Sequence, residues 1–238
     1  SWHRYTDVVT AGLRGADLVT APSAAMLAEL ARHYGPFRAG PHVYNGRSAA
    51  DFPPGEKRPY FFTAGRLWDS AKNVAAVARV APHLAWPVRV AGPTHHPDGG
   101  GASFDGVHML GKLEPAELAA QLARAAVCVQ PARYEPFGLL PLEAALAGCA
   151  LVLGDIPSQR EIWDDAALYV RPDDDDHLRD TLLRLQSDRD LVRAMADAAR
   201  ARAARYTPER MADETWHLDE RMLDDWGADH HADRQAAG

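Results

Sequence analysis

The stretch AVCVQPARYEPFGLLPLEAALAGCALVLGD, residues 126–155, decides the fold. It opens with a short apolar run that ends at Pro131, passes through a polar loop, continues as a helical pattern from Gly138 and closes with a second apolar run. Short apolar runs bounded by Pro, Gly or Asp are typical of buried strands. A strand, a helix and a second strand in this order predict a β-α-β unit, in which the two strands are parallel.

The same alternation extends from Pro59 to Asp188. Buried strands are predicted at residues 60–65, 88–92, 107–111, 126–132, 150–155 and 167–172, and helices at 72–84, 115–126, 138–148 and 175–188. This pattern predicts an α/β fold, a Rossmann-like parallel sheet with helices on both faces. Ligands of such sheets bind beyond the carboxyl ends of the strands, so we expect the chemistry there.

The composition is that of an ordinary globular protein, with 238 residues, 47% of them hydrophobic, and a formal net charge of -7. The negative balance and the scattered arginines argue against a nucleic-acid partner. The sequence has no apolar run near the roughly 20 residues of a membrane span, and it opens with no signal peptide. Cys128 and Cys149 lack metal-ligand spacing, so we expect buried free thiols rather than a disulfide, and a reducing, cytoplasmic location.

We predict three parts of the chain: residues 1–54, the end of an N-terminal domain and a linker; 55–205, the main α/β domain; and 206–238, a final helix and a polar tail. In the first part, 16–22 is strand-like, and a helix is expected over 23–35 with Ser23 as its N-cap. In the last part, Thr207 and Pro208 predict the start of the helix, and 227–238 reads as a disordered tail. The sequence begins with Ser in mid-pattern, so we expect a fragment or a processed chain.

Two polar segments invite a functional interpretation that we consider weak. Residues 93–106 form a Gly-rich connection that we predict to be a mobile loop, and the adjacent His95 and His96 have poor geometry for sharing a metal. The acidic cluster at 171–176 precedes a predicted helix, whose positive N-terminal end favours negative charge, so capping is the better interpretation.

Two glutamates flank the start of the helix that begins near Gly138. Glu135 should lie in the loop after the strand, and Glu143 about one and a half turns into the helix. Between them, the free amides of Gly138, Leu139 and Leu140 form a site suited to an anion. The alternative is that both glutamates are merely solvated polar positions.

Two cations strengthen the functional interpretation. Arg66 follows the first predicted strand, and Lys72 begins the next predicted helix, so both should reach the same carboxyl edge as Glu135. Two cations, a helix start and two carboxylates suit one ligand, a diphosphate with hydroxyl-rich groups at both ends. Solvated surface cations are the alternative.

At this point the chain resembles the donor-binding half of a retaining glycosyltransferase of the GT-B fold, in the large family 4 group. The resemblance rests on FTAGRLWDSAKN (62–73), on ARYEPFGLLPLEAALAG (132–148) with its E-x7-E spacing, and on LGDIPSQREIWDDAALYVRPDD (153–174). Upstream, ADLVTAPSAAMLAEL (16–30) and VYNGRS (43–48) match the end of an acceptor domain more weakly. Residues 55–205 would then be the nucleotide-sugar domain. The final helix would cross back to the other domain.

The resemblance implies a role for each matching residue. Arg66 and Lys72 would hold the donor diphosphate, Glu135 would contact hydroxyls of the transferred sugar, and Glu143 would accept from the ribose hydroxyls. The other donor-binding positions would be Gly65, Leu113, Pro136, Phe137, Gly138, Leu139 and Leu140. The segment 111–113 would line the base mostly through its backbone. The donor would be a nucleotide sugar of the UDP or GDP type, with no metal and no other cofactor.

The resemblance also has departures and rivals. Cys149 and Ala150 replace part of the usual Gly-x-Pro-Val-Val, and most of the first domain of the family is absent. We therefore expect this chain to bind a nucleotide but to transfer sugar poorly alone, and to contact a membrane only through the absent part. The rivals are a nucleotide-sugar epimerase of the same fold and a non-catalytic binding module. A nicotinamide-dependent oxidoreductase lacks support because no G-x-G-x-x-G follows the first strand.

Trp216 and Trp226 lie in the predicted final helix. They would either cover a surface between two domains, and so be partly exposed in this chain, or pack within the domain itself.

Overall fold

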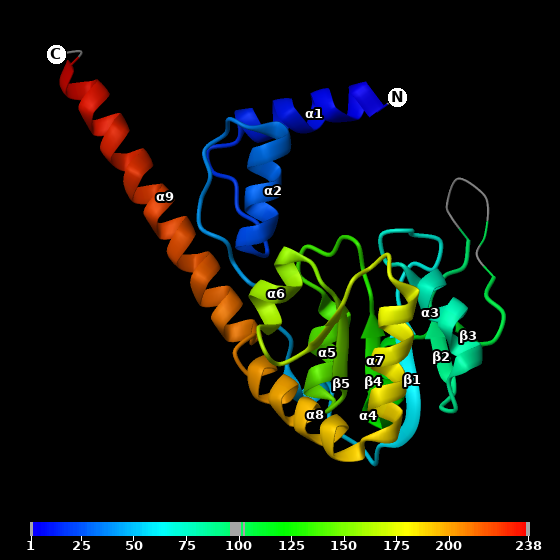
Figure 1. Cartoon of the computed structure of the whole chain (residues 1–238). Helices are drawn as coiled ribbons and strands as arrows, with labels where there is room; N and C mark the ends of the chain where they lie inside the picture. Colours follow the sequence, from blue (N-terminus) through cyan, green and yellow to red (C-terminus); the bar gives the residue numbers. More distant parts are fainter. Residues whose placement is uncertain (1, 96–100, 102, 237–238) are drawn as a thin grey trace.

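The computed structural model describes residues 2–95, 101 and 103–236 (Figure 1). Its centre is one sheet of six parallel strands in the order β3-β2-β1-β4-β5-β6. The strands are β1 (Arg58–Ala64), β2 (Val88–Ala91), β3 (His108–Gly111), β4 (Ala125–Gln130), β5 (Ala150–Gly154) and β6 (Leu168–Val170). Strands form at all six ranges predicted between residues 60 and 172. Burial is confirmed for the central strands β4 and β5, but it is wrong for β3, which lies at the edge of the sheet and is largely exposed.

Helices cover both faces of the sheet, as the sequence predicts (Figure 1). On one face, α4 (Pro115–Arg124) and α5 (Leu139–Leu146) pack in a core that includes Phe62 and Leu151. On the other face, α3 (Val74–Val80) and α7 (Asp175–Ser187) pack in a second core with Phe61 and Val127. The alternation of side chains along β1 therefore serves two cores, and a parallel strand buried on both faces reads as a continuous apolar run.

The remaining helices lie around this sheet and its two helical layers. They are α1 (Trp2–Gly15), α2 (Ala24–Tyr34), α6 (Pro157–Trp163), α8 (Arg189–Ala203) and α9 (Pro208–Ala236), with short 3-10 turns at Ala49–Asp51 and Ala81–His83. Figure 1 shows α1 and α2 beyond the carboxyl edge of the sheet, and α9 extending away from the sheet past α2. None of the helices in the described residues is both long and apolar enough to cross a membrane.

Several predicted helix starts are confirmed by their caps. The Ser23 hydroxyl accepts from the amide of Met26 at 3.1 Å, and the Asp174 carboxylate accepts from the amide of His177 at 2.8 Å. The Thr207 hydroxyl accepts from the amide of Arg210 at 3.2 Å. The acidic cluster before α7 is thus a capping feature. Cys128 and Cys149 are free and buried.

The structure also corrects some predictions. Residues 16–22 form no strand, because only Val19 makes a bridge, to Ala39. The helices α1, α6 and α8 were not predicted. Lys72 does not begin a helix but lies in the turn before α3, and α9 continues to Ala236 through residues that we expected to be disordered.

The structure describes only part of the predicted mobile loop and only one of the two tryptophan side chains. Residues 96–100 and 102 lie outside the described residues, so the loop prediction is not tested there, and His96 is among these residues. Trp216 is 64% exposed, so it does not pack within this domain, and the Trp226 side chain lies outside the description.

Candidate functional site

The sheet places a cavity at the point where its strand order reverses. The chain moves outward from β1 to β2 and β3, then returns to β4 on the other side of β1. The carboxyl ends of β1 and β4 therefore diverge, which is where open α/β sheets bind ligands. A cavity of about 360 Å³ lies there, lined by Pro22, Asn45, Ala64, Gly65, Lys72, Gln130, Glu135, Pro136, Phe137, Gly138, Leu139 and Leu140.

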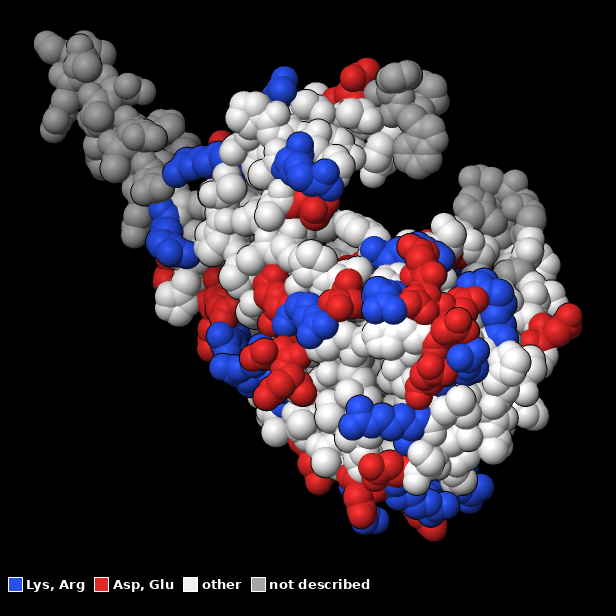
Figure 2. Space-filling view, viewed as in Figure 1, with Lys and Arg blue, Asp and Glu red and all other residues white. Residues whose placement is uncertain are grey.

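Charged side chains of both signs gather at this edge of the molecule. Figure 2 shows acidic and basic groups side by side over α7 and the neighbouring loops, and an indentation between the α1–α2 segment and the sheet. The ion pairs there include Arg79 with Asp175 at 2.5 Å and Arg133 with Asp173 at 2.8 Å. These arginines and carboxylates are thus already paired with one another.

Lys72 and Glu135 meet at the cavity, as the sequence predicts. The Lys72 Nζ atom donates to Glu135 Oε2 at 2.5 Å, and the two side chains are 18% and 10% exposed. Gln130 Nε2 donates to the same carboxylate oxygen at 3.3 Å. Gln130 Oε1 is buried and has no partner among the described residues. A lysine, a carboxylate and an unused amide oxygen therefore line one cavity, and together they can bind an anion beside hydroxyl groups.

The loop that carries Glu135 is held in place by side chains that donate hydrogen bonds to its backbone carbonyls. Four side chains from different parts of the chain donate to them: Asn73 Nδ2 to Pro131 O (2.9 Å), Ser158 Oγ to Glu135 O (2.5 Å), Ser23 Oγ to Pro136 O (2.6 Å) and Gln159 Nε2 to Phe137 O (3.0 Å). Hydrogen bonds of this kind fix the loop in one conformation before any ligand arrives.

These four supporting residues were not predicted as parts of the site. Asn73, Ser158 and Gln159 lie inside the stretches that carry the family resemblance, which is the signal that could have found them. Ser23 was recognised as a helix cap, and the structure gives it a second bond across 113 residues.

Glu161 fastens the upstream segment to the same region. Its carboxylate accepts from the amides of Ala24 and Ala25, each at 2.8 Å, and from the Tyr44 hydroxyl at 2.9 Å. Burial and this carboxylate raise the pKa of Tyr44, so the hydroxyl stays a donor. Because α2 is anchored at its N-terminus, Pro22 and Asn45 are held in place at the wall of the cavity.

Gly138 makes the helix start accessible. Its φ of 95° lies in the left-handed region, and a Cβ atom there would lie 3.1 Å from Gln159 Nε2. The turn at Gly138 lets α5 begin at Leu139 directly beside the cavity. The first amides of a helix have no acceptor within the helix, so this end can receive negative charge.

Glu143 lies deeper than we expected and does not line the cavity. Its carboxylate is 12% exposed and accepts from Arg47 Nε at 2.9 Å. Burial raises the pKa of Glu143, and Arg47 opposes this rise. Arg47 lies in the stretch 43–48 that weakly matches the family, but its pairing with Glu143 was not predicted, because the two residues are 96 positions apart.

Arg66 and Leu113 are also outside the cavity lining, although both were predicted to contact the donor. The Arg66 guanidinium pairs with Asp69 at 2.7 Å, is 58% exposed, and lies 5.4 Å from the Trp68 ring centre. Leu113 packs partly buried against the core beside α4. Gly65, the other predicted residue of this edge, lines the cavity.

The described residues contain no group of three or more His, Cys, Asp or Glu side chains that could hold a metal ion. His95, which is described, hydrogen-bonds through Nδ1 with Thr94 Oγ1 at 3.0 Å. The polar groups that line the cavity are a lysine, an asparagine, a glutamine, a carboxylate and backbone amides.

Replacing Arg47 with alanine is expected to destabilise the protein in a pH-dependent way. Without Arg47 the raised pKa of Glu143 rises further, so the folded state holds this proton up to higher pH than the unfolded chain does. Stability is then lost as pH rises through the pKa of folded Glu143, by about 1 kcal/mol because the pair is partly exposed. Urea unfolding at about pH 5 and about pH 8 measures this loss. Arg47→Lys is the control, and an equal loss for Arg47→Ala at both pH values would contradict it.

The fold is that of GT-B glycosyltransferases. Sucrose-phosphate synthase from Thermosynechococcus elongatus superposes with a TM-score of 0.82 at 21% identity, over 93% of this chain and 62% of that chain. HepE from Anabaena, solved with UDP and glucose, gives a TM-score of 0.78 at 16% identity, over 94% of this chain and 68% of that chain. At these identities the likeness establishes the fold.

The sequence establishes the family. The profile of the family described as Glycosyl transferases group 1 matches residues 58–188, so the chain belongs to that family. Glycogen synthase of Mycobacterium tuberculosis is 34% identical over 161 residues, which are 60% of this chain and 39% of that protein. The O-antigen chain mannosyltransferase RfbU of Salmonella typhimurium is 28% identical over 145 residues, 56% of this chain and 40% of that protein. The chain spans about two fifths of the length of these curated relatives.

Proposed function

We propose that the chain supplies the donor-binding part of a retaining glycosyltransferase that moves a hexosyl group from a nucleoside-diphosphate sugar to a glycan, lipid or small-molecule acceptor. The observation that carries the proposal is the pair of Lys72 and Glu135 in the cavity beside the start of α5. A cation and helix amides suit a diphosphate, and the carboxylate suits the hydroxyls of the attached sugar. HepE, a structural neighbour, was solved with UDP-glucose.

In the proposed reaction, the acceptor hydroxyl oxygen bonds to the anomeric carbon while the bond from that carbon to the phosphate oxygen breaks. The bonding electrons leave with the diphosphate, and the proton of the acceptor passes to a phosphate oxygen. Lys72 stabilises the charge on the leaving group, together with Arg66 once the Arg66 side chain has left its ion pair with Asp69. Glu135 orients the sugar and is not an acid/base catalyst of the glycosidase kind.

We propose that the Glu143 carboxylate accepts hydrogen bonds from the ribose hydroxyls. This assignment requires the carboxylate to share its hydrogen bonds between Arg47 and the ribose hydroxyls, because Arg47 occupies one oxygen. A carboxylate has about four acceptor positions, so both partners can be accommodated. We further propose that the reaction needs no metal, since Arg66, Lys72 and helix amides supply the positive charge. Two free buried thiols suit a reducing compartment, so we propose a cytoplasmic location.

Calorimetric titration with nucleotides of decreasing phosphate content tests the donor site. We expect one of UDP, GDP or ADP to bind, its monophosphate to bind at least about tenfold more weakly, and the nucleoside more weakly still, because the diphosphate makes the charged contacts. Inorganic pyrophosphate should compete. If no diphosphate binds, or if the nucleoside binds as tightly as the diphosphate, the proposal fails.

Labelled donor sugar then separates the possible activities. We expect slow hydrolysis by this chain and little transfer, because it spans about two fifths of its curated relatives and the acceptor side is assigned to a further domain. An epimerised sugar would indicate the epimerase, and binding without turnover even in a longer chain would indicate a non-catalytic module. Robust transfer by this polypeptide alone would contradict the assignment of the acceptor side.

A further inference from the structure

A second cavity lies at the amino edge of the sheet, at the opposite end of the strands from the donor cavity. This amino-edge pocket has a volume of about 190 Å³, and its walls include Lys57, Arg58, Trp86, Arg189, Val192 and Arg193. Arg58 begins β1 and Arg189 begins α8, so the sheet and a helix contribute one guanidinium each. No residue assigned to the donor site reaches this pocket.

The charge of the pocket is unusual for this chain. This chain carries a formal net charge of -7, and many of its arginines are held by carboxylates, among them Arg66 and Arg160. Across residues 2–95, 101 and 103–236, by contrast, neither Arg58 nor Arg189 has a hydrogen bond or an ion pair from its side chain. The residues that line the pocket include no acid. Two exposed arginines whose side chains have no such partner among the described residues therefore line one small cavity.

The other two cations of the pocket are already engaged but add to its positive field. Lys57 Nζ donates to Leu122 O at 3.0 Å and to Ala147 O at 2.6 Å. Arg193 pairs with Asp190 on the same helix. Burial lowers the pKa of Lys57, and a bound anion would favour its charged form. The lining of the pocket thus carries four cationic residues and no acidic one, and Arg193 is paired with Asp190 beside it.

Trp86 gives the pocket a rigid flat wall. The amide nitrogens of Ala85 and Trp86 both donate to Gln186 Oε1, at 3.0 and 3.3 Å. The Trp86 ring lies 5.4 Å from the ring of buried Phe61, centre to centre. The backbone at Trp86 is thus fixed and its ring packs beside Phe61, so the ring offers an aromatic surface on which a flat or ring-shaped group can stack.

We propose that the amino-edge pocket binds a small organic phosphate, whose phosphate is held by Arg58 and Arg189 and whose ring contacts Trp86. Arginine forks match phosphate oxygens, which explains two free guanidinium groups at one place. The pocket is smaller than the donor cavity of about 360 Å³, so its ligand is smaller than a nucleotide sugar. The site is separate from the proposed donor site and does not depend on it.

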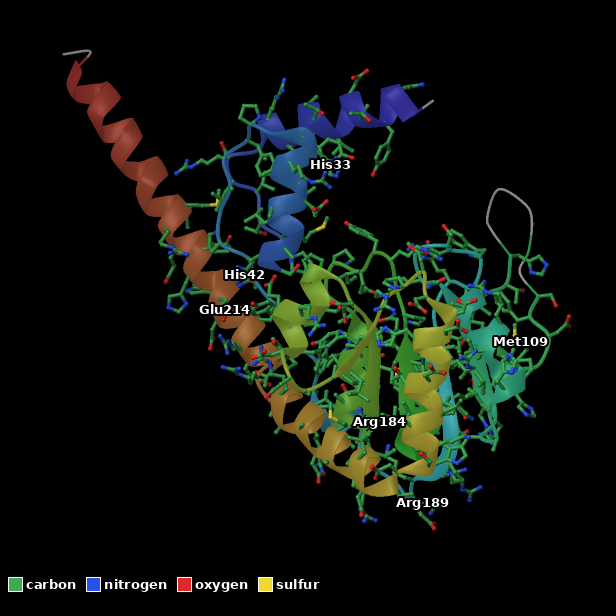
Figure 3. All side chains as sticks on the ribbon, in the orientation of Figure 1. His33, His42, Met109, Arg184, Arg189 and Glu214 are labelled. Atoms are coloured by element: carbon green, nitrogen blue, oxygen red, sulfur yellow. The ribbon has the colours of Figure 1, made fainter. Side chains whose placement is uncertain are left out.

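Nuclear magnetic resonance titration with phenyl phosphate tests this site. The indole resonance of Trp86, assigned by its loss in Trp86→Phe, is expected to move and saturate. Arg58→Gln/Arg189→Gln should weaken the binding about tenfold or more, since two charged contacts are removed. Arg184→Gln is the matched control, because Arg184 lies on α7 and does not line the pocket, whereas Arg189 lies at the start of α8 and does (Figure 3). It should bind phenyl phosphate like the parent.

Two further experiments distinguish binding at this pocket from binding at the donor cavity and from weak stacking on Trp86. Lys72→Ala should leave the Trp86 titration unchanged, because Lys72 lines the other cavity. Inorganic phosphate should bind about threefold or more weakly than phenyl phosphate, and phenol should not saturate, since each lacks one of the two contacts. A Trp86 resonance that does not move, a double arginine variant that binds like the parent, or loss of binding in Lys72→Ala would overturn the proposal. Unchanged resonances elsewhere in the spectra establish that the variants are folded.

Discussion

Replacing Lys72 with alanine is expected to lower the affinity of the chain for its nucleoside diphosphate by about 10- to 100-fold. The lysine supplies a charged hydrogen bond in a cavity where its side chain is 18% exposed, and such bonds contribute about 1.5–3 kcal/mol. The affinity for the nucleoside without phosphates should stay the same. Calorimetric titration of parent and variant measures both.

The same substitution also leaves the Glu135 carboxylate without its cation, so part of its effect could come from a disturbed loop. Lys72→Ala/Glu135→Gln removes the unpaired charge and should recover thermal stability without recovering diphosphate binding. Arg179→Ala, which removes a partly exposed cation from ion pairs with Asp176 and Asp180 on α7, is the matched control and should bind like the parent. Diphosphate binding that survives in both Lys72 variants would remove Lys72 from the site.

Replacing Gly154 with alanine is expected to destabilise the fold by about 3 kcal/mol, because overpacking against backbone cannot relax by a side-chain movement. A Cβ atom on Gly154 would lie 2.1 Å from the carbonyl oxygen of Ala132. The close approach joins the end of β5 to the loop that leads to Glu135. The variant should therefore lose nucleotide affinity as well as stability, which urea unfolding and calorimetry measure separately.

The matched control is Gly12→Ala, the same substitution in α1, where a Cβ atom would meet nothing within 4 Å. Alanine in an exposed helix is favoured over glycine by up to about 1 kcal/mol, so this variant should be as stable as the parent or slightly more stable. If Gly154→Ala behaves like Gly12→Ala, the contact between β5 and the loop does not constrain the site.

The centre of the sheet could be predicted from the sequence because β4 and β5 are buried on both faces, whereas the edge strand β3 is largely exposed. Strands buried on both faces read as uninterrupted apolar runs, as in β5, where all residues are buried. Helix α8 was not predicted, since its sequence is rich in arginine and buries only Ala199 and Ala203 fully. The strand expected at 16–22 did not form. In this segment only Val19 forms a β-bridge, to Ala39, and a single bridge does not make a strand.

The site was predictable where the sheet itself brings residues together. Lys72 and Glu135 follow neighbouring parallel strands, β1 and β4, so their meeting at one edge follows from the topology. The pairing of Arg47 with Glu143 was not predictable, because it depends on how the upstream segment folds back over α5. The same holds for Ser23, which reaches Pro136 from outside the sheet.

These upstream contacts limit how relatives of this chain can exchange parts. A recombination point near residue 55 would separate Ser23 from Pro136, Arg47 from Glu143 and Tyr44 from Glu161. A chimaera joined there would keep an intact sheet and yet combine a loop from one parent with supports from the other. The segment that ends at Arg47 and the loop that carries Glu135 must therefore be exchanged together, although they are far apart in the sequence.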